Sequence, residues 1–179
     1  MRKSIGSYLL KKKFSNLQRE IQVSNLQTAA SIGIVYFSDS AQKEEEIKKM
    51  VAFLEKNQIK VETIAMLPNT KEEMPVSSIK NFYLTQKELN FYRIPGSAES
   101  KKFIVKKFDI LIDCNFGNHF PLRYISSLSK AKFKVGPAGG YHDKVCDLTI
   151  SMKEPVTLKE YLEQTKHYLQ IINQKKNEQ

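Results

Sequence analysis

A continuous apolar run, SIGIVYF at Ser31–Phe37, sets the first limit on how this chain folds. A strand without polar alternation is typical of a sheet that is covered on both faces. Asp39 and Gln42 then match a capping box, which predicts a helix from this point to about Asn57. The next expected strand is Lys60–Leu67. A strand, a helix and a strand in so short a span predict a βαβ unit with parallel strands.

The same alternation continues along the chain. Further strands are expected at Asn81–Thr85, Asn90–Ile94, Asp109–Cys114, Phe133–Gly136 and Asp147–Met152. Further helices are expected at Ala98–Phe108, at Pro121–Ala131 and from the capping box Thr157–Glu160 to a polar tail. Polar, proline-bounded Pro68–Ser78 is expected to be a loop. The pattern predicts an α/β three-layer sandwich with a mostly parallel, Rossmann-like sheet, as a single domain over residues 31–175.

Residues 1–22 are expected to form an N-terminal arm, a basic amphipathic helix. Leu10, Phe14, Leu17 and Ile21 recur at helical spacing and would lie on one stripe. The helix would pack this stripe onto the domain and keep its charged face in water. The basic residues at the sides and back of the stripe are Lys11, Lys12, Lys13 and Arg19.

The chain has 179 residues, a length typical of one domain. Hydrophobic residues make up 41% of it, which excludes wholesale disorder. The longest apolar run, Ile32–Phe37, is far shorter than the roughly 20 residues that cross a bilayer, and no secretory signal is recognisable. Two cysteines provide no disulfide framework. These features predict a cytoplasmic protein without a transmembrane segment.

The net charge of +10 is distributed unevenly. Residues 1–22 contribute +5 and residues 101–134 contribute +6. Residues 39–99 contribute −1, and residues 135–179 are neutral. Two positive segments in an otherwise balanced chain favour an anionic partner, provided that both segments lie on one face of the protein.

We therefore expect a non-enzymatic protein whose basic surface contacts RNA or a ribonucleoprotein. Contacts of lysine and arginine with phosphates release counterions, and this release favours binding. An acidic protein or a membrane surface could use the same charge. No catalytic residue and no cofactor is assigned, and the oligomeric state is left open. The expected nucleic-acid contacts are Lys11, Lys12, Lys13, Arg19, Lys101, Lys102, Lys106, Lys107, Arg123, Lys130, Lys132 and Lys134.

The alternative is a small-molecule or nucleotide-binding Rossmann-like domain, either a binding protein or an enzyme. In open α/β sheets, ligands lie beyond the carboxyl ends of the strands, where the strand order reverses. Two of the loops expected there contain glycines, whose N–H groups can approach a phosphate. Neither loop matches a dinucleotide or P-loop pattern. The residues of this alternative site are Asp39, Ser40, Asn115, Gly117, Asn118, His119, Gly136, Gly139 and Gly140.

The other reactive side chains favour structural roles. The possible metal ligands lack the short spacing of zinc motifs, so no metal is expected; they are Cys114, His119, His142 and Cys146. Cys114 could act as a nucleophile with either histidine as base, but a cysteine at the end of an apolar strand is more typical of a core. Asp109 and Asp113 could pair as acid and base, although ordinary hydrogen bonds at the strand ends are the simpler expectation.

Residues 108–136, FDILIDCNFGNHFPLRYISSLSKAKFKVG, resemble the acceptor-side half of bacterial heptosyltransferases. The likeness consists of a strand with D-x-L-I-D, a helix with a basic residue and a strand that ends in glycine. The chain is too short to hold the sugar-nucleotide-binding half, so the resemblance implies a glycosyltransferase-like half without its donor domain. The whole chain also resembles short uncharacterised bacterial α/β proteins, which implies no function.

Overall fold

The structure, a computed structural model, describes residues 2–69, 78 and 80–173. Most of the expected Pro68–Ser78 loop and the polar tail after residue 173 lie outside this part of the chain. In chain order the elements are α1 (Arg2–Ser15), β1 (Ser31–Phe37), α2 (Ala41–Lys56), β2 (Lys60–Met66), β3 (Asn81–Leu84), η1 (Gln86–Glu88), α3 (Ala98–Val105), β4 (Ile110–Cys114), α4 (Phe120–Leu128), β5 (Phe133–Pro137), α5 (His142–Val145), β6 (Leu148–Ile150) and α6 (Leu158–Ile171).

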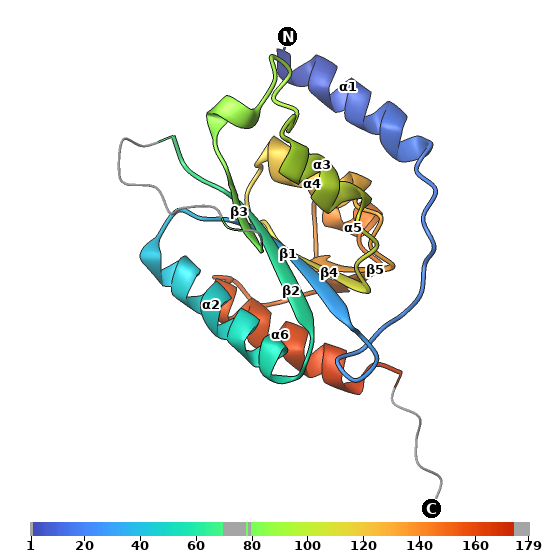
Figure 1. The fold of residues 1–179 in the computed structure, drawn as a ribbon, viewed down its shortest axis with the longest axis vertical. Coiled ribbons are helices and arrows are strands. Elements are labelled where there is room, and N and C mark those ends of the chain that lie inside the picture. Colours follow the sequence, from blue (N-terminus) through green and yellow to red (C-terminus); the bar gives the residue numbers. More distant parts are fainter. Residues whose placement is uncertain (1, 70–77, 79, 174–179) are drawn as a thin grey trace, which may run out of the picture.

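The strands form one six-stranded sheet in the order β3-β2-β1-β4-β5-β6, and every neighbouring pair is parallel (Figure 1). β1 lies in the centre, where Ile32 stands opposite Val61 of β2 and Ile110 of β4. The strand order reverses between β1 and β4, so this is where a Rossmann-like sheet opens a crevice at its carboxyl edge. The predicted parallel α/β fold is confirmed.

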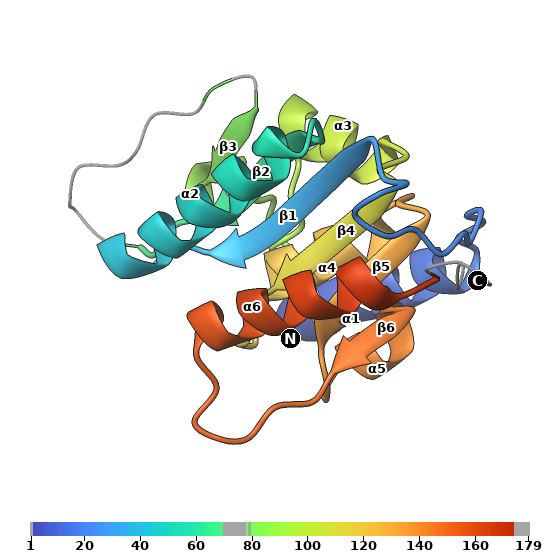
Figure 2. The ribbon, with the colours of Figure 1, turned by 90° about the horizontal axis from the view of Figure 1, so that it is seen from below.

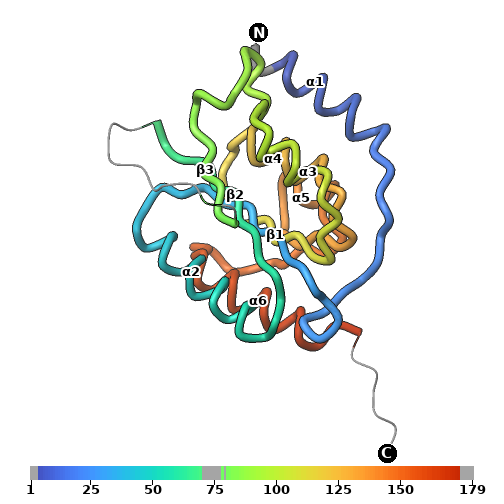
Figure 3. The backbone as a smooth tube through the Cα atoms, viewed as in Figure 1, coloured from blue at the N-terminus to red at the C-terminus, as the bar shows by residue number. Residues whose placement is uncertain are grey.

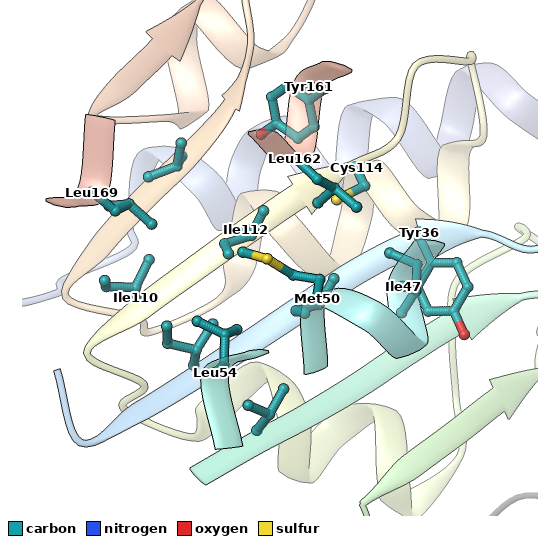
Figure 4. Packing of buried hydrophobic residues seen from close by; sticks show 14 of the residues in the cluster. Tyr36, Ile47, Met50, Leu54, Ile110, Ile112, Cys114, Tyr161, Leu162 and Leu169 are labelled. Carbon is teal, nitrogen blue, oxygen red and sulfur yellow. The ribbon is translucent and has the colours of Figure 1, made fainter. Parts of the chain in front are cut away.

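Helices α2 and α6 cover one face of the sheet (Figure 2). Met50 and Leu54 of α2 are fully buried, as is Tyr161 of α6, and all three pack in one cluster with Ile112 of β4 (Figure 4). The uninterrupted apolar strands are explained by this layer together with the one on the opposite face.

Helices α3 and α4 cover that opposite face. Leu122 and Ile125 of α4 pack with Val35 of β1 and with Phe108, which follows α3. Gly33 of β1 makes room for this packing, because a Cβ atom there would lie 2.9 Å from the Phe108 ring. The three-layer sandwich expected from the sequence is therefore present.

Helix α1 forms a further layer on the outer side of α4. Leu10 is 3% exposed and packs with Tyr124 and Leu128 of α4. The N-terminal helix is thus confirmed, but its predicted length is wrong: it ends at Ser15, and Ile21 is 64% exposed. Beyond the helix the chain runs along one flank of the domain to β1 (Figure 3).

Local hydrogen bonds explain two further differences from the sequence prediction. Ser40, not Asp39, caps α2, because its hydroxyl accepts a hydrogen bond from the Lys43 N–H at 3.3 Å. The strand expected at Asn90–Ile94 is wrong. The Asn90 side chain accepts hydrogen bonds from two backbone N–H groups of this segment, which makes a turn in place of sheet pairing.

Candidate functional site

Two regions of the molecule bring predicted site residues together. The first is the carboxyl edge of the sheet, where the loops after β1, β4 and β5 meet. The ring of Phe37, the last residue of β1, stacks on that of His119, with centroids 3.8 Å apart and an interplanar angle of 17°. The loop after β4 therefore touches β1 at the point where the strand order reverses.

A chain of hydrogen bonds runs beneath this contact, and we call Asp113, Tyr141, Asn115 and His119 the polar chain. The Tyr141 hydroxyl donates to Asp113 Oδ2 at 2.7 Å, and Asn115 Nδ2 donates to Tyr141 at 3.1 Å. Asn115 Oδ1 lies 2.7 Å from His119 Nδ1. Asp113 and Asn115 are each 1% exposed, so the inner half of the chain is shielded from water.

The direction of these hydrogen bonds fixes the histidine tautomer. Burial and the neighbouring Asp113 raise the pKa of Tyr141, so its hydroxyl keeps its proton and donates to that carboxylate. Asn115 must then turn its NH₂ toward Tyr141 and its oxygen toward His119, which places the histidine proton on Nδ1. Burial and the nearby Lys43 lower the pKa of His119. The ring is therefore neutral at pH 7, with Nε2 as a hydrogen-bond acceptor.

The glycines of the alternative site have structural roles. Gly117 lies against the His119 ring, since a Cβ atom there would be 2.4 Å from Cε1. Gly136 packs against Cys146 in the same manner, since a Cβ atom at this position would lie 2.7 Å from Cys146 Sγ. The N–H of Gly139 donates to Asp143 at 2.8 Å, which leaves it unavailable to a phosphate. Gly139 and Gly140 have φ angles of 102° and 62°, so glycine suits the turn itself.

The remaining residues of that alternative lie around the same edge. Asp39 is exposed and pairs with Lys43 at 2.7 Å, while Asn118 is exposed in the loop before α4. Ser40 is occupied as the cap of α2. Sequence reasoning placed Asn115 and His119 in one loop at this edge, but it did not predict the hydrogen bonds by which the Tyr141 hydroxyl joins the loops after β4 and β5.

The reactive side chains considered in the sequence are separated or buried. Cys114 is 4% exposed, and burial raises the pKa of its thiol, which disfavours a nucleophilic thiolate. Asp109 binds Lys132 at 3.1 Å and Asp113 binds Tyr141, so the two carboxylates do not act as a pair. No three His, Cys, Asp or Glu side chains gather into a metal site in the part of the chain that the structure describes.

The second region is a groove on the flank that the N-terminal arm crosses, and we call it the basic groove. It consists of a hollow of about 610 Å³ and one of about 410 Å³ that share Leu17, Gln18 and Lys130. Residues from Lys13 to Ile21 form one wall. The basic side chains of its lining are Lys13, Arg19, Lys107, Lys130, Lys132 and Lys144.

Arg19 holds the arm in place along this groove. Its guanidinium donates to the carbonyl oxygens of Ala131 and Lys132 at 3.2 and 3.1 Å, and it pairs with Asp147 at 2.5 Å. The Gln22 N–H adds a hydrogen bond to the Lys132 carbonyl at 3.1 Å. These bonds replace the helical ones that the sequence predicted for residues 16–22. As a result, the two basic segments of the chain lie side by side.

The cations of the groove fall into three groups. Lys13 is exposed and donates to the Tyr124 hydroxyl at 2.9 Å. Arg19 and Lys132 are bound to aspartates within the wall. Lys107, Lys130 and Lys144 are exposed, and none of them forms an ion pair among the described residues. These three ammonium groups are therefore available to an anionic partner without breaking an existing ion pair.

The other expected nucleic-acid contacts lie outside the groove lining. Lys106 pairs with Glu62 of β2, and the Arg123 guanidinium lies 5.6 Å from the centre of the Tyr141 ring. Lys134 is fully buried, so its ammonium cannot reach a partner at the surface. Exposed on α1 and α3 are Lys11, Lys12, Lys101 and Lys102.

Sequence reasoning missed Lys144, which lies in the neutral C-terminal quarter of the chain. A charge count over long segments hides a single lysine whose neighbours in sequence include acidic residues. The fold brings it to the groove through α5, a short helix that the sequence analysis did not predict.

None of the described helices is long and apolar enough to cross a membrane. Over residues 2–172 the chain matches the model of DUF6913, a family of unknown function, and it belongs to that family. Neither the curated proteins nor the solved structures gave a match. The local likeness to heptosyltransferases therefore has no support from these comparisons.

Proposed function

We propose that this member of the DUF6913 family binds RNA, and that the basic groove is the binding surface. One observation carries the proposal: cations from the N-terminal arm and from residues 107–132 line the same groove. The charge pattern of the sequence indicates an anionic partner only if the two segments share a face. Part of each segment supports this condition, since Lys13 and Arg19 of the first and Lys107, Lys130 and Lys132 of the second line one groove.

The chemistry of the groove suits phosphate groups. Lys107, Lys130 and Lys144 present ammonium groups that no carboxylate of the described residues neutralises. Lysines placed along a groove attract a phosphate backbone largely independently of base sequence, because each contact releases counterions. Arg19 and Lys132 keep the wall in place through their ion pairs and add positive potential.

A charge-reversal pair tests where RNA binds. The groove variant is K107E/K130E/K144E, and the matched control is K48E/K56E/K159E, which changes net charge equally on exposed lysines of α2 and α6. At 100 mM salt we expect the groove variant to bind a structured RNA at least about tenfold more weakly than the unmodified protein, as three lost phosphate contacts imply. The control should change affinity by less than about threefold.

Thermal unfolding of each variant checks that the fold is intact. Equal losses in both variants would show that net charge alone governs binding, which contradicts a specific groove.

An acidic protein is the competing partner of this surface. Nuclease treatment distinguishes the two, since a complex captured from cell extract through the groove lysines and resistant to nuclease contradicts an RNA partner.

A small polar ligand at the carboxyl edge is a second candidate, favoured by the polar chain. The last member of the polar chain is His119, which is neutral and half-buried. It lies where the strand order reverses, which is where Rossmann-like sheets bind ligands. Thermal unfolding with AMP, UDP and inorganic phosphate tests it. A ligand that raises the Tm of the unmodified protein but not that of His119→Ala supports this site. The absence of any shift among these probes contradicts a nucleotide or phosphate site.

A further inference from the structure

We infer that the basic groove receives an unpaired RNA strand whose bases lie against apolar side chains of the N-terminal arm. This inference rests on the proposed function and adds the class of RNA. The observation behind it is the mixed lining of the groove, which combines apolar side chains with the available cations and one carboxylate, that of Glu20.

The apolar part of the lining comes mainly from the arm. Phe14 and Leu17 are half-buried in the groove wall, and Ile21 is 64% exposed there. Val145, next to Lys144, also lines this hollow but is only 6% exposed. An isoleucine this exposed among cations gains nothing from a ligand made of charge alone, such as polyphosphate. It gains from a ligand that brings flat apolar surface together with negative charge.

An unpaired strand has both properties. Its phosphates repeat along the backbone, and its base faces are free to contact side chains, as in grooves that bind single strands. A duplex shows its phosphates but stacks its bases on one another, and A-form RNA is contacted across its shallow minor groove over about 16 base pairs. The apolar wall would contribute little to such a complex.

The layout of the lining matches a strand that follows the arm. The two hollows share Leu17, Gln18 and Lys130, so the groove is continuous along the arm. Lys13 lines the hollow beside α4, and Lys107 and Lys144 line the other. Gln18 is exposed between them and carries both a donor and an acceptor for base edges. A backbone held by the lysines would therefore place bases over Leu17 and Ile21.

Three probes and one substitution test this inference. The probes are an unstructured 20-nucleotide RNA, a 20-base-pair RNA duplex and heparin, a polyanion without bases. The substitution is Ile21→Ser, with Ile171→Ser as control, because Ile171 is 50% exposed on α6 and does not line the groove. We expect the unmodified protein to bind the single strand about tenfold more tightly than the duplex at 150 mM salt.

We also expect Ile21→Ser to weaken binding of the single strand by about threefold to fivefold, while heparin binding stays unchanged. Ile171→Ser should affect neither probe. Equal affinity for single strand and duplex, together with an unaffected Ile21→Ser variant, overturns the inference but leaves RNA binding in place. If neither RNA binds, the proposed function fails with it. Heparin binding alone would then show a surface for polyanions in general.

Discussion

Lys134 illustrates how one residue can be charged in the sequence and hidden in the fold. Its Nζ donates to the carbonyl oxygens of Ser126 and Ser127, at 2.8 and 3.1 Å, near the C-terminal end of α4. Burial, with a smaller effect of the nearby Arg19, lowers the pKa of Lys134 to about 7. The carbonyl groups at the end of α4 thus gain a hydrogen-bond donor, but burying the charged ammonium group is energetically unfavourable.

This lowered pKa predicts how stability changes with pH. Between pH 7 and the ordinary lysine pKa near 10.4, the unfolded chain binds more protons at this residue than the folded one. Its contribution to the free energy of unfolding therefore rises with pH, by about 2 kcal/mol from pH 6.5 to 8.5. Lys134→Met keeps the bulk of the side chain and removes the titration.

Chemical denaturation of the unmodified protein and of Lys134→Met over this pH range measures the difference. Staying below pH 8.5 limits the opposite contribution of the two cysteines, whose thiol pKa values are raised by burial. The stability gap between the two proteins should change steadily with pH. Parallel pH profiles would show that Lys134 does not titrate in this range.

At the scale of elements, the arm after α1 is held to the domain by few bonds. Arg19 supplies three of them, to two carbonyl oxygens and to Asp147. The arm also forms one wall of the basic groove. Its position is therefore what joins the two positive segments of the chain into a single surface.

Replacing Arg19 with Met should loosen this wall without unfolding the domain. Charge-assisted hydrogen bonds contribute about 1.5–3 kcal/mol each when partly buried, and Arg19 is 11% exposed. We expect faster amide hydrogen exchange at Gln22, whose N–H is bonded to the Lys132 carbonyl, and RNA binding weakened by at least about threefold. Unchanged exchange at Gln22 would mean that Arg19 does not hold the arm.

Most of the element order could be predicted from the sequence because parallel strands that are buried on both faces have continuous apolar sequences. β1 is found at Ser31–Phe37 with the bounds that the pattern predicts, and the Thr157 cap of α6 is confirmed. The arm could not be predicted in the same way. Leu17 and Ile21 continue the helical spacing, but Arg19 and Gln22 bond to a distant part of the chain instead.

The candidate sites followed the same rule. Asn115 and His119 could be placed together because they lie four residues apart after one strand. Tyr141 and Lys144 could not be placed, since their roles depend on how the loop after β5 folds back against β4 and the arm. A contact between segments far apart in sequence leaves no periodic signal.

At the scale of the whole molecule, the fold shows where the cations behind the formal charge of +10 lie. The arm and residues 107–132 meet at one groove, while Lys134 is buried and Arg123 lies toward the carboxyl edge. We propose that RNA binds here by pairing its phosphates with Lys107, Lys130 and Lys144. The affinity must then fall as salt rises, and the slope of log K against log salt depends on the number of lysine–phosphate contacts.

The salt dependence of affinity therefore tests the account most directly. For an unpaired RNA strand from 50 to 300 mM salt, three phosphate contacts predict a slope of log K against log salt of about −2 or steeper. In K107E/K130E/K144E this slope should become shallower by roughly 2, whereas K48E/K56E/K159E should keep it. Binding that is indifferent to salt, or a slope that the groove variant leaves unchanged, would contradict the account.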